Sequence, residues 1–132
     1  MRPKLLSTEL AVNLLPAVGV SIIVAAIQLF PQSLQHIVRY DRAAIAEGEF
    51  WRIITGHLAH LGWNHLVMNV AGLWLVTYVF APAGKPWLWA TGMLATAMLT
   101  SAGLYFFNPQ LSFYVGLSGV LHGIIVIGAL RW

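Results

Sequence analysis

Charged and apolar positions along this chain are separated into long blocks, unlike the short amphipathic repeats of a soluble helix or strand. Residues 10–30 contain no charged side chain, and a helix needs roughly 20 apolar residues to cross the hydrocarbon core of a bilayer. This block predicts a first membrane-spanning helix over residues 10–30. Residues 63–83 are again free of charge, and the proline- and glycine-containing cluster from Pro82 to Pro86 stops the block, so a second span is expected over residues 63–83.

The last third of the chain is apolar for long enough to hold two helices. No charged residue occurs between Pro86 and Leu130, and the only strong turn signal inside this stretch is Asn108-Pro109-Gln110. We therefore expect spans over residues 86–107 and 115–132. The connection between the first two spans, residues 31–62, instead mixes charged and apolar residues, which is typical of a segment lying at the membrane interface.

The composition indicates that the four apolar blocks are the spans of an all-α membrane protein. The chain has 132 residues, of which 59% are hydrophobic and 8% charged, whereas a soluble domain carries about 25% charged residues. It contains no cysteine, which excludes disulfides, cysteine metal sites and thiol nucleophiles. The net charge of +3 comes from scattered basic residues, so we expect the lipid bilayer, and not nucleic acid, as a partner.

The distribution of basic residues predicts the orientation. Cytoplasmic segments carry an excess of Lys and Arg. Alternating spans place four basic residues on the side of the N-terminus (Arg2, Lys4, Lys85 and Arg131) and three on the other (Arg39, Arg42 and Arg52). We expect a multi-pass protein of a bacterial inner (plasma) membrane with a cytoplasmic N-terminus.

Polar residues gather at the starts of the second and fourth expected spans. His65 and Asn69 are four residues apart and share one helix face, and Gly116-Leu117-Ser118-Gly119 opens the last span. Because successive spans alternate in direction, both groups lie in the same leaflet. A serine that attacks a carbonyl needs a base and hydrogen-bond donors for the developing oxyanion. The arrangement indicates an acyl-transfer centre.

These motifs resemble the rhomboid intramembrane serine proteases. The resemblance rests on Trp51-Arg52, His60, His65-x-x-x-Asn69 and Gly116-Leu117-Ser118-Gly119, in that order. It implies a rhomboid-like helical bundle with a long interfacial first loop, and an endopeptidase that cleaves membrane-anchored proteins near the outer membrane face without a cofactor or metal.

The resemblance also implies a role for each matching residue. Ser118 becomes the nucleophile, and His65, Asn69 and the backbone N–H of Ser118 line the oxyanion hole. Trp51 and Arg52 take a structural role in the first loop, while His60, Gly116 and Gly119 support the site. The family's base is a histidine on a later helix, so we expect that histidine beyond residue 132, a chain truncated after its fourth span, and no activity from these residues alone.

His122 points to a subgroup. Many rhomboids carry tyrosine at this position, whereas Ser118-Gly119-Val120-Leu121-His122-Gly123 is similar to the rhombosortases. Their substrates carry a C-terminal membrane anchor containing Gly-Gly. The expected partner is therefore a transmembrane protein substrate with such an anchor.

Other interpretations of the same residues stay open. Gly119-x-x-x-Gly123 is also a helix-packing motif, and His65 and Asn69 can simply hydrogen-bond between helices. His122, one turn after Ser118, is either its base or a packing residue. As a whole, the chain is alternatively a non-catalytic rhomboid-like binder of transmembrane helices. A further alternative is a metal-binding or haem-binding membrane protein that uses four histidines, His57, His60, His65 and His122.

Overall fold

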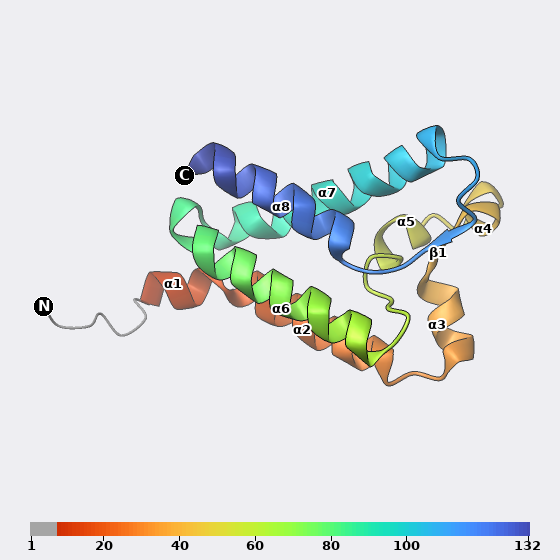
Figure 1. The fold of residues 1–132 in the computed structure, drawn as a ribbon, viewed down its shortest axis with the longest axis horizontal. Coiled ribbons are helices and arrows are strands. Elements are labelled where there is room, and N and C mark those ends of the chain that lie inside the picture. The colour runs from red at the N-terminus through yellow and green to blue at the C-terminus, as the bar shows by residue number, and fades with distance from the viewer. Residues whose placement is uncertain (1–7) are drawn as a thin grey trace, which may run out of the picture.

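The computed structural model describes residues 8–132 and is mainly helical (Figure 1). Three helical segments, residues 8–28, 63–83 and 86–107, are long and apolar enough to cross a membrane, and a shorter apolar helix covers Ser118–Arg131. The protein is thus an all-α, multi-pass membrane protein. The elements in chain order are α1 (Thr8–Asn13), α2 (Leu15–Gln28), α3 (Gln32–Val38), β1 (Tyr40–Asp41), α4 (Arg42–Ala46), α5 (Arg52–Thr55), α6 (Trp63–Phe80), the 3₁₀ helix η1 (Ala81–Ala83), α7 (Pro86–Phe107), β2 (Phe113–Tyr114) and α8 (Ser118–Arg131).

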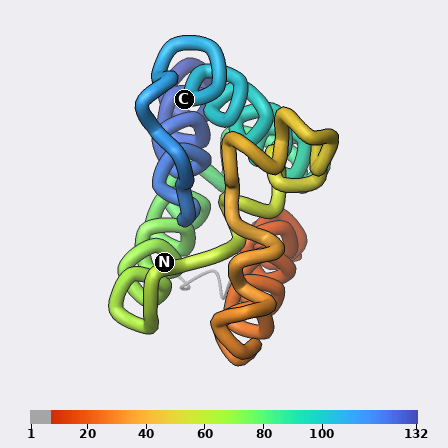
Figure 2. The backbone as a smooth tube through the Cα atoms, turned by 90° about the vertical axis from the view of Figure 1, so that its right-hand side faces the viewer, coloured from red at the N-terminus to blue at the C-terminus, as the bar shows by residue number. Residues whose placement is uncertain are grey.

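The four long helices form a bundle in which α6 and α8 run in one direction and α2 and α7 in the other (Figure 1). The N-terminal ends of α6 and α8 therefore lie at the same end of the bundle. The short elements α3, α4, α5 and β1 lie at that end too, as the view onto it in Figure 2 shows. This arrangement brings the first loop next to the segment that leads into α8.

Small residues let α8 approach α7 closely. A Cβ atom added to Gly119 would lie 2.7 Å from Cγ2 of Thr100, and one added to Gly123 would overlap Cγ2 of Thr96. The apolar interior next to this contact includes Leu73, Trp89 and Ile124, all fully buried. Gly119-x-x-x-Gly123 is therefore a helix-packing motif in this fold, whatever else the residues around it do.

The helices differ at several ends from the ranges expected for the spans. The first helical segment is interrupted at Leu14, two residues before Pro16, whose ring removes one backbone hydrogen bond and crowds the preceding turn. It ends at Gln28 because Pro31 disfavours helical geometry in the residue before it. The last helix begins at Ser118 and not at residue 115, because Gly116 has a φ of +111°, outside the helical region.

The first loop, residues 31–62, is folded onto the segment before α8 by backbone hydrogen bonds. Strands β1 and β2 pair antiparallel, with Tyr40 opposite Tyr114. The N–H of Arg42 donates to the carbonyl of Ser112 at 2.9 Å, and the N–H of Gly116 donates to the carbonyl of Gly56 at 3.2 Å. The loop therefore fixes the path of the chain just before Ser118.

Candidate active site

Ser118 is the first residue of α8, and its side chain is half-buried at the loop end of the bundle. The first N–H groups of a helix have no carbonyl partner within the helix, and the helix dipole makes this end attractive to negative charge. Gly116 supplies the turn into the helix. Gly116, with its positive φ, and Gly119, packed against Thr100, flank the Leu117-Ser118 pair.

His65 lies directly against this turn. A Cβ atom on Gly116 would lie 2.7 Å from Cε1 and 2.9 Å from Nε2 of the His65 ring, so only glycine fits beneath the imidazole. The backbone N–H of Leu61 donates to His65 Nδ1 at 3.4 Å. In the neutral ring the proton is therefore on Nε2. This places an N–H donor beside Gly116, at the entrance to α8.

Asn69 is buried one turn further along α6 and is held by its own helix. Its Nδ2 donates to the backbone carbonyl of His65 at 2.8 Å. The amide has a second hydrogen that this bond does not use. Within residues 8–132, no hydrogen bond joins Ser118 to His65 or Asn69, and the His65 ring lies against Gly116, two residues before Ser118.

The hydroxyl of Ser118 has a different partner, which the sequence analysis did not single out. Tyr114 Oη lies 2.9 Å from Ser118 Oγ and accepts a hydrogen bond from the backbone N–H of Gly119 at 3.2 Å. Tyr114 is in β2, four residues before Ser118, on an extended segment. A spacing of four joins side chains on a helix, but Tyr114 lies outside α8, so it is the turn at Gly116 that brings the two hydroxyls together.

His122 contacts the backbone of Ser118 and not its hydroxyl. Its Nδ1 lies 2.7 Å from the Ser118 carbonyl oxygen, and its side chain is exposed. Because a carbonyl can only accept, Nδ1 is the donor. This geometry does not align His122 to take the hydroxyl proton of Ser118.

His57 and His60 are buried at the base of the first loop. His57 Nε2 contacts the carbonyl of Ala97 at 2.9 Å and Oγ of Ser101 at 3.0 Å, which joins the loop to α7. Burial lowers the pKa of His57, although the hydrogen bond to Ala97 opposes this. Burial, with the neighbouring His65 second, lowers the pKa of His60 to about 4. Both rings are therefore neutral near pH 7.

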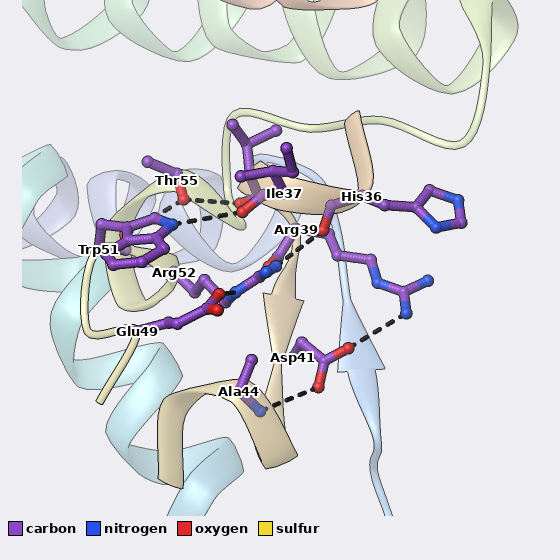
Figure 3. A network of polar contacts seen from close by, with 10 residues as sticks. His36, Ile37, Arg39, Asp41, Ala44, Glu49, Trp51, Arg52 and Thr55 are labelled. Carbon is purple, nitrogen blue, oxygen red and sulfur yellow. Dashed lines mark hydrogen bonds and ion pairs between the residues drawn. The ribbon is translucent and has the colours of Figure 1, made fainter. Parts of the chain in front are cut away.

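Trp51 and Arg52 occupy the centre of the first loop (Figure 3). Trp51 Nε1 donates to the carbonyl of Ile37 at 3.3 Å. Arg52 is buried, donates to the carbonyls of His36 and Arg39 at 2.7 and 3.0 Å, and forms an ion pair with Glu49. These contacts tie α3 and the start of β1 to α5. Both residues are far from Ser118 in the sequence, but their loop pairs with β2.

The histidines named in the metal-binding alternative do not form a ligand group. Among residues 8–132 there is no set of three or more His, Asp or Glu side chains that could hold a metal ion. His57 uses one ring nitrogen on α7, whereas His122 is exposed beside the Ser118 carbonyl.

Two proteins from Bacillus subtilis (strain 168) are similar to this chain. The protein named "Putative rhomboid protease YdcA" is 33% identical over 84 residues, which cover 61% of this chain and 40% of YdcA. "Rhomboid protease GluP" is 31% identical over 92 residues, which cover 70% of this chain and 17% of GluP. The chain therefore matches less than half the length of either relative.

The family comparison covers most of the elements described above. The rhomboid domain matches residues 47–131, from the middle of the first loop through the last residue of α8. This range includes the contact of His65 with Gly116 and the serine at the start of α8. The chain belongs to the rhomboid family.

Proposed function

We propose that the protein is an intramembrane serine endopeptidase whose nucleophile is Ser118. The observation that carries this proposal is the position of Ser118: a half-buried hydroxyl on the first residue of α8, reached through a glycine turn on which the His65 ring rests. Membership of the rhomboid family and two relatives named as rhomboid proteases support the same chemistry.

The oxyanion of the tetrahedral intermediate is proposed to bind between the start of α8 and the side chains of α6. Ser118 N–H belongs to the first turn of α8, where helix N–H groups lack intrahelical partners. The Nε2–H of His65 lies beside Gly116, and Asn69 has an amide hydrogen free of the bond to the His65 carbonyl. Donors fixed before the reaction stabilise the developing charge without reorganisation.

The reaction also needs a general base, which is proposed to be a histidine other than His122. His122 is directed to the carbonyl of Ser118, and no other histidine of residues 8–132 is hydrogen-bonded to Ser118 Oγ. A serine hydroxyl without a positioned base is a weak nucleophile at neutral pH. Residues 1–132 expressed alone should then show little Ser118-dependent cleavage, and robust cleavage would make His122 the leading base.

The proposed substrate is a transmembrane protein cut near the outer membrane face, with a Gly-Gly-containing C-terminal anchor as in the rhombosortase-like subgroup. This finer assignment rests on His122 in the motif after Ser118. Two matched substrates, one with Gly-Gly and one with Leu-Leu at the same site, test it. Equal cleavage of both would contradict the subgroup assignment.

The decisive experiment uses the full-length protein in liposomes with a transmembrane substrate and a fluorophosphonate probe. Ser118→Ala should abolish both cleavage and labelling, whereas the exposed Ser112→Ala should change neither. His65→Ala or Asn69→Ala should each reduce the rate by roughly 10-fold to 1000-fold as an oxyanion donor is lost. Substrate binding without any labelling of Ser118 would instead favour a non-catalytic binder.

The proposed orientation places the loop end of the bundle at the outer face and the N-terminus in the cytoplasm of a bacterial inner membrane. The chain has no cysteine, so single cysteines can be introduced without removing others. Cysteines at Glu47 and Gly84 should react with an impermeant reagent from opposite sides. Labelling of both from one side would overturn this topology.

A further inference from the structure

We propose that Tyr114 is a positioning residue for the nucleophile: its hydroxyl holds Ser118 Oγ and takes up the Gly119 N–H, so that the Ser118 N–H stays available to an oxyanion. This inference rests on the proposed function of Ser118. The carrying observation is a pair of contacts at one oxygen, Tyr114 Oη to Ser118 Oγ at 2.9 Å and the Gly119 N–H to Tyr114 Oη at 3.2 Å.

Chemistry fixes the direction of one of these two bonds. A backbone N–H can only donate, so Tyr114 Oη accepts from Gly119. In the other bond either oxygen can be the donor, and in the proposed arrangement the phenolic hydrogen goes to Ser118 Oγ, which has lone pairs to accept it. The hydroxyl hydrogen of Ser118 is then not used by Tyr114 and is left for a base. The opposite direction would sequester that hydrogen and hinder the reaction.

The Tyr114 ring is held from two sides, which is what a positioning residue requires. Its backbone is in β2, opposite the fully buried Tyr40. The edge of the ring meets the imidazole of His57, with ring centroids 5.4 Å apart and an interplanar angle of 61°. His57 is in turn fixed on α7 through Ala97. The hydroxyl thus has a defined position relative to the first turn of α8.

The reaction step keeps the proton of Tyr114 in place. Ser118 Oγ forms the bond to the carbonyl carbon, its hydrogen passes to the base, and the carbonyl π electrons move to the oxygen. Tyr114 donates to Oγ while negative charge builds on it and loses no proton. Because Tyr114 also satisfies Gly119 N–H, the nearest N–H without a helical partner is that of Ser118 itself.

The test compares Tyr114→Phe with wild type in the full-length protein in liposomes. Phenylalanine keeps the ring that contacts His57 and removes only the hydroxyl. We expect kcat and the rate of fluorophosphonate labelling at Ser118 to fall about tenfold, the scale of one lost hydrogen bond, with KM unchanged and only a small drop in melting temperature from the Gly119 N–H that loses its acceptor. Tyr78→Phe on the exposed face of α6 is the matched control.

Each other outcome has a definite meaning. An unchanged or faster labelling rate in Tyr114→Phe would overturn the inference, since the hydroxyl would then be idle or inhibitory. A lower melting temperature with a matching loss of active protein would overturn it as well, because the role would be structural. Absence of labelling and cleavage in the wild type would refute the proposed function itself. A wild type and a Tyr114→Phe variant that react equally would refute only the role of Tyr114.

Discussion

The first loop and the start of α8 are held in shape by opposite means. In the loop, side chains reach the backbone: Arg52 donates to two carbonyls, and Thr55 Oγ1 donates to the carbonyl of Val38 at 2.6 Å. At the start of α8, the geometry depends on missing side chains. Gly116 and Gly123 stand where a methyl group would collide with His65 and Thr96.

The two regions are therefore expected to respond differently to substitution. Removing one of these donor side chains from the loop leaves buried carbonyls without hydrogen-bond donors. This change should lower mainly the stability of the fold. Adding an atom near Ser118 displaces the groups that surround the nucleophile. This change should lower mainly the rate of cleavage. The loop still matters for catalysis, because its backbone hydrogen bonds to residues 112–116 set the path into α8.

The largest stability effect is expected from Arg52→Met. The substitution keeps much of the side-chain length but removes the donors to His36 and Arg39 and leaves Glu49 unpaired, which should lower the free energy of unfolding by about 3 kcal/mol or more. Reversible unfolding in bicelles measures it. Arg39→Met is the control, because its ion pair with Asp41 is partly exposed and should be worth at most about 1 kcal/mol. Equal losses in both variants would refute the special role of the buried arginine.

Gly116→Ala should affect the rate more than the stability. Alanine at φ +111° is strained, and its Cβ would push on the His65 ring. We expect cleavage to fall about 100-fold, the effect of losing one oxyanion donor. The comparison variant is Gly62→Ala, where an added Cβ meets no atom within 4 Å. A Gly116→Ala protein with wild-type kcat would show that His65 need not rest on this turn.

Gly123→Ala tests the close approach of α7 and α8. Its Cβ would collide with Thr96, and overpacking of this kind costs about 1–3 kcal/mol. Pairing it with Thr96→Ser removes the colliding methyl group but keeps the Cβ atom, 2.6 Å from the added one, and should restore part of the lost stability. The measurement is again unfolding in bicelles. Failure of the second substitution to rescue the first would place the strain elsewhere.

The sequence predicted the helices better than the junctions between them. The expected ranges 63–83 and 86–107 coincide with apolar helical segments because charge-free blocks bounded by prolines leave little freedom. The late start of α8 was not predicted, because a positive φ at Gly116 is a property of the fold and not of the glycine alone. The resemblance pointed to Ser118 and His65. It did not point to Tyr114, which reaches Ser118 only through the turn.

The smallest expected effect is a pH dependence of stability that arises from His60 in the first loop. The pKa of His60 in the fold is about 4, below its ordinary value of 6.5, so between these values the unfolded chain binds the proton more readily. The contribution of the neutral His60 ring to the free energy of unfolding is complete above pH 6.5 and is lost as the pH falls from there through 4. We expect a loss on the order of 1 kcal/mol between pH 7 and pH 5. His60→Asn should flatten this part of the profile, whereas the exposed His36→Asn should not.

His57, whose pKa is also lowered by burial, remains in both variants and moves stability in the same direction, so the difference between the two profiles isolates His60. Identical profiles for His60→Asn and wild type would show that the buried ring next to His65 does not titrate in this range.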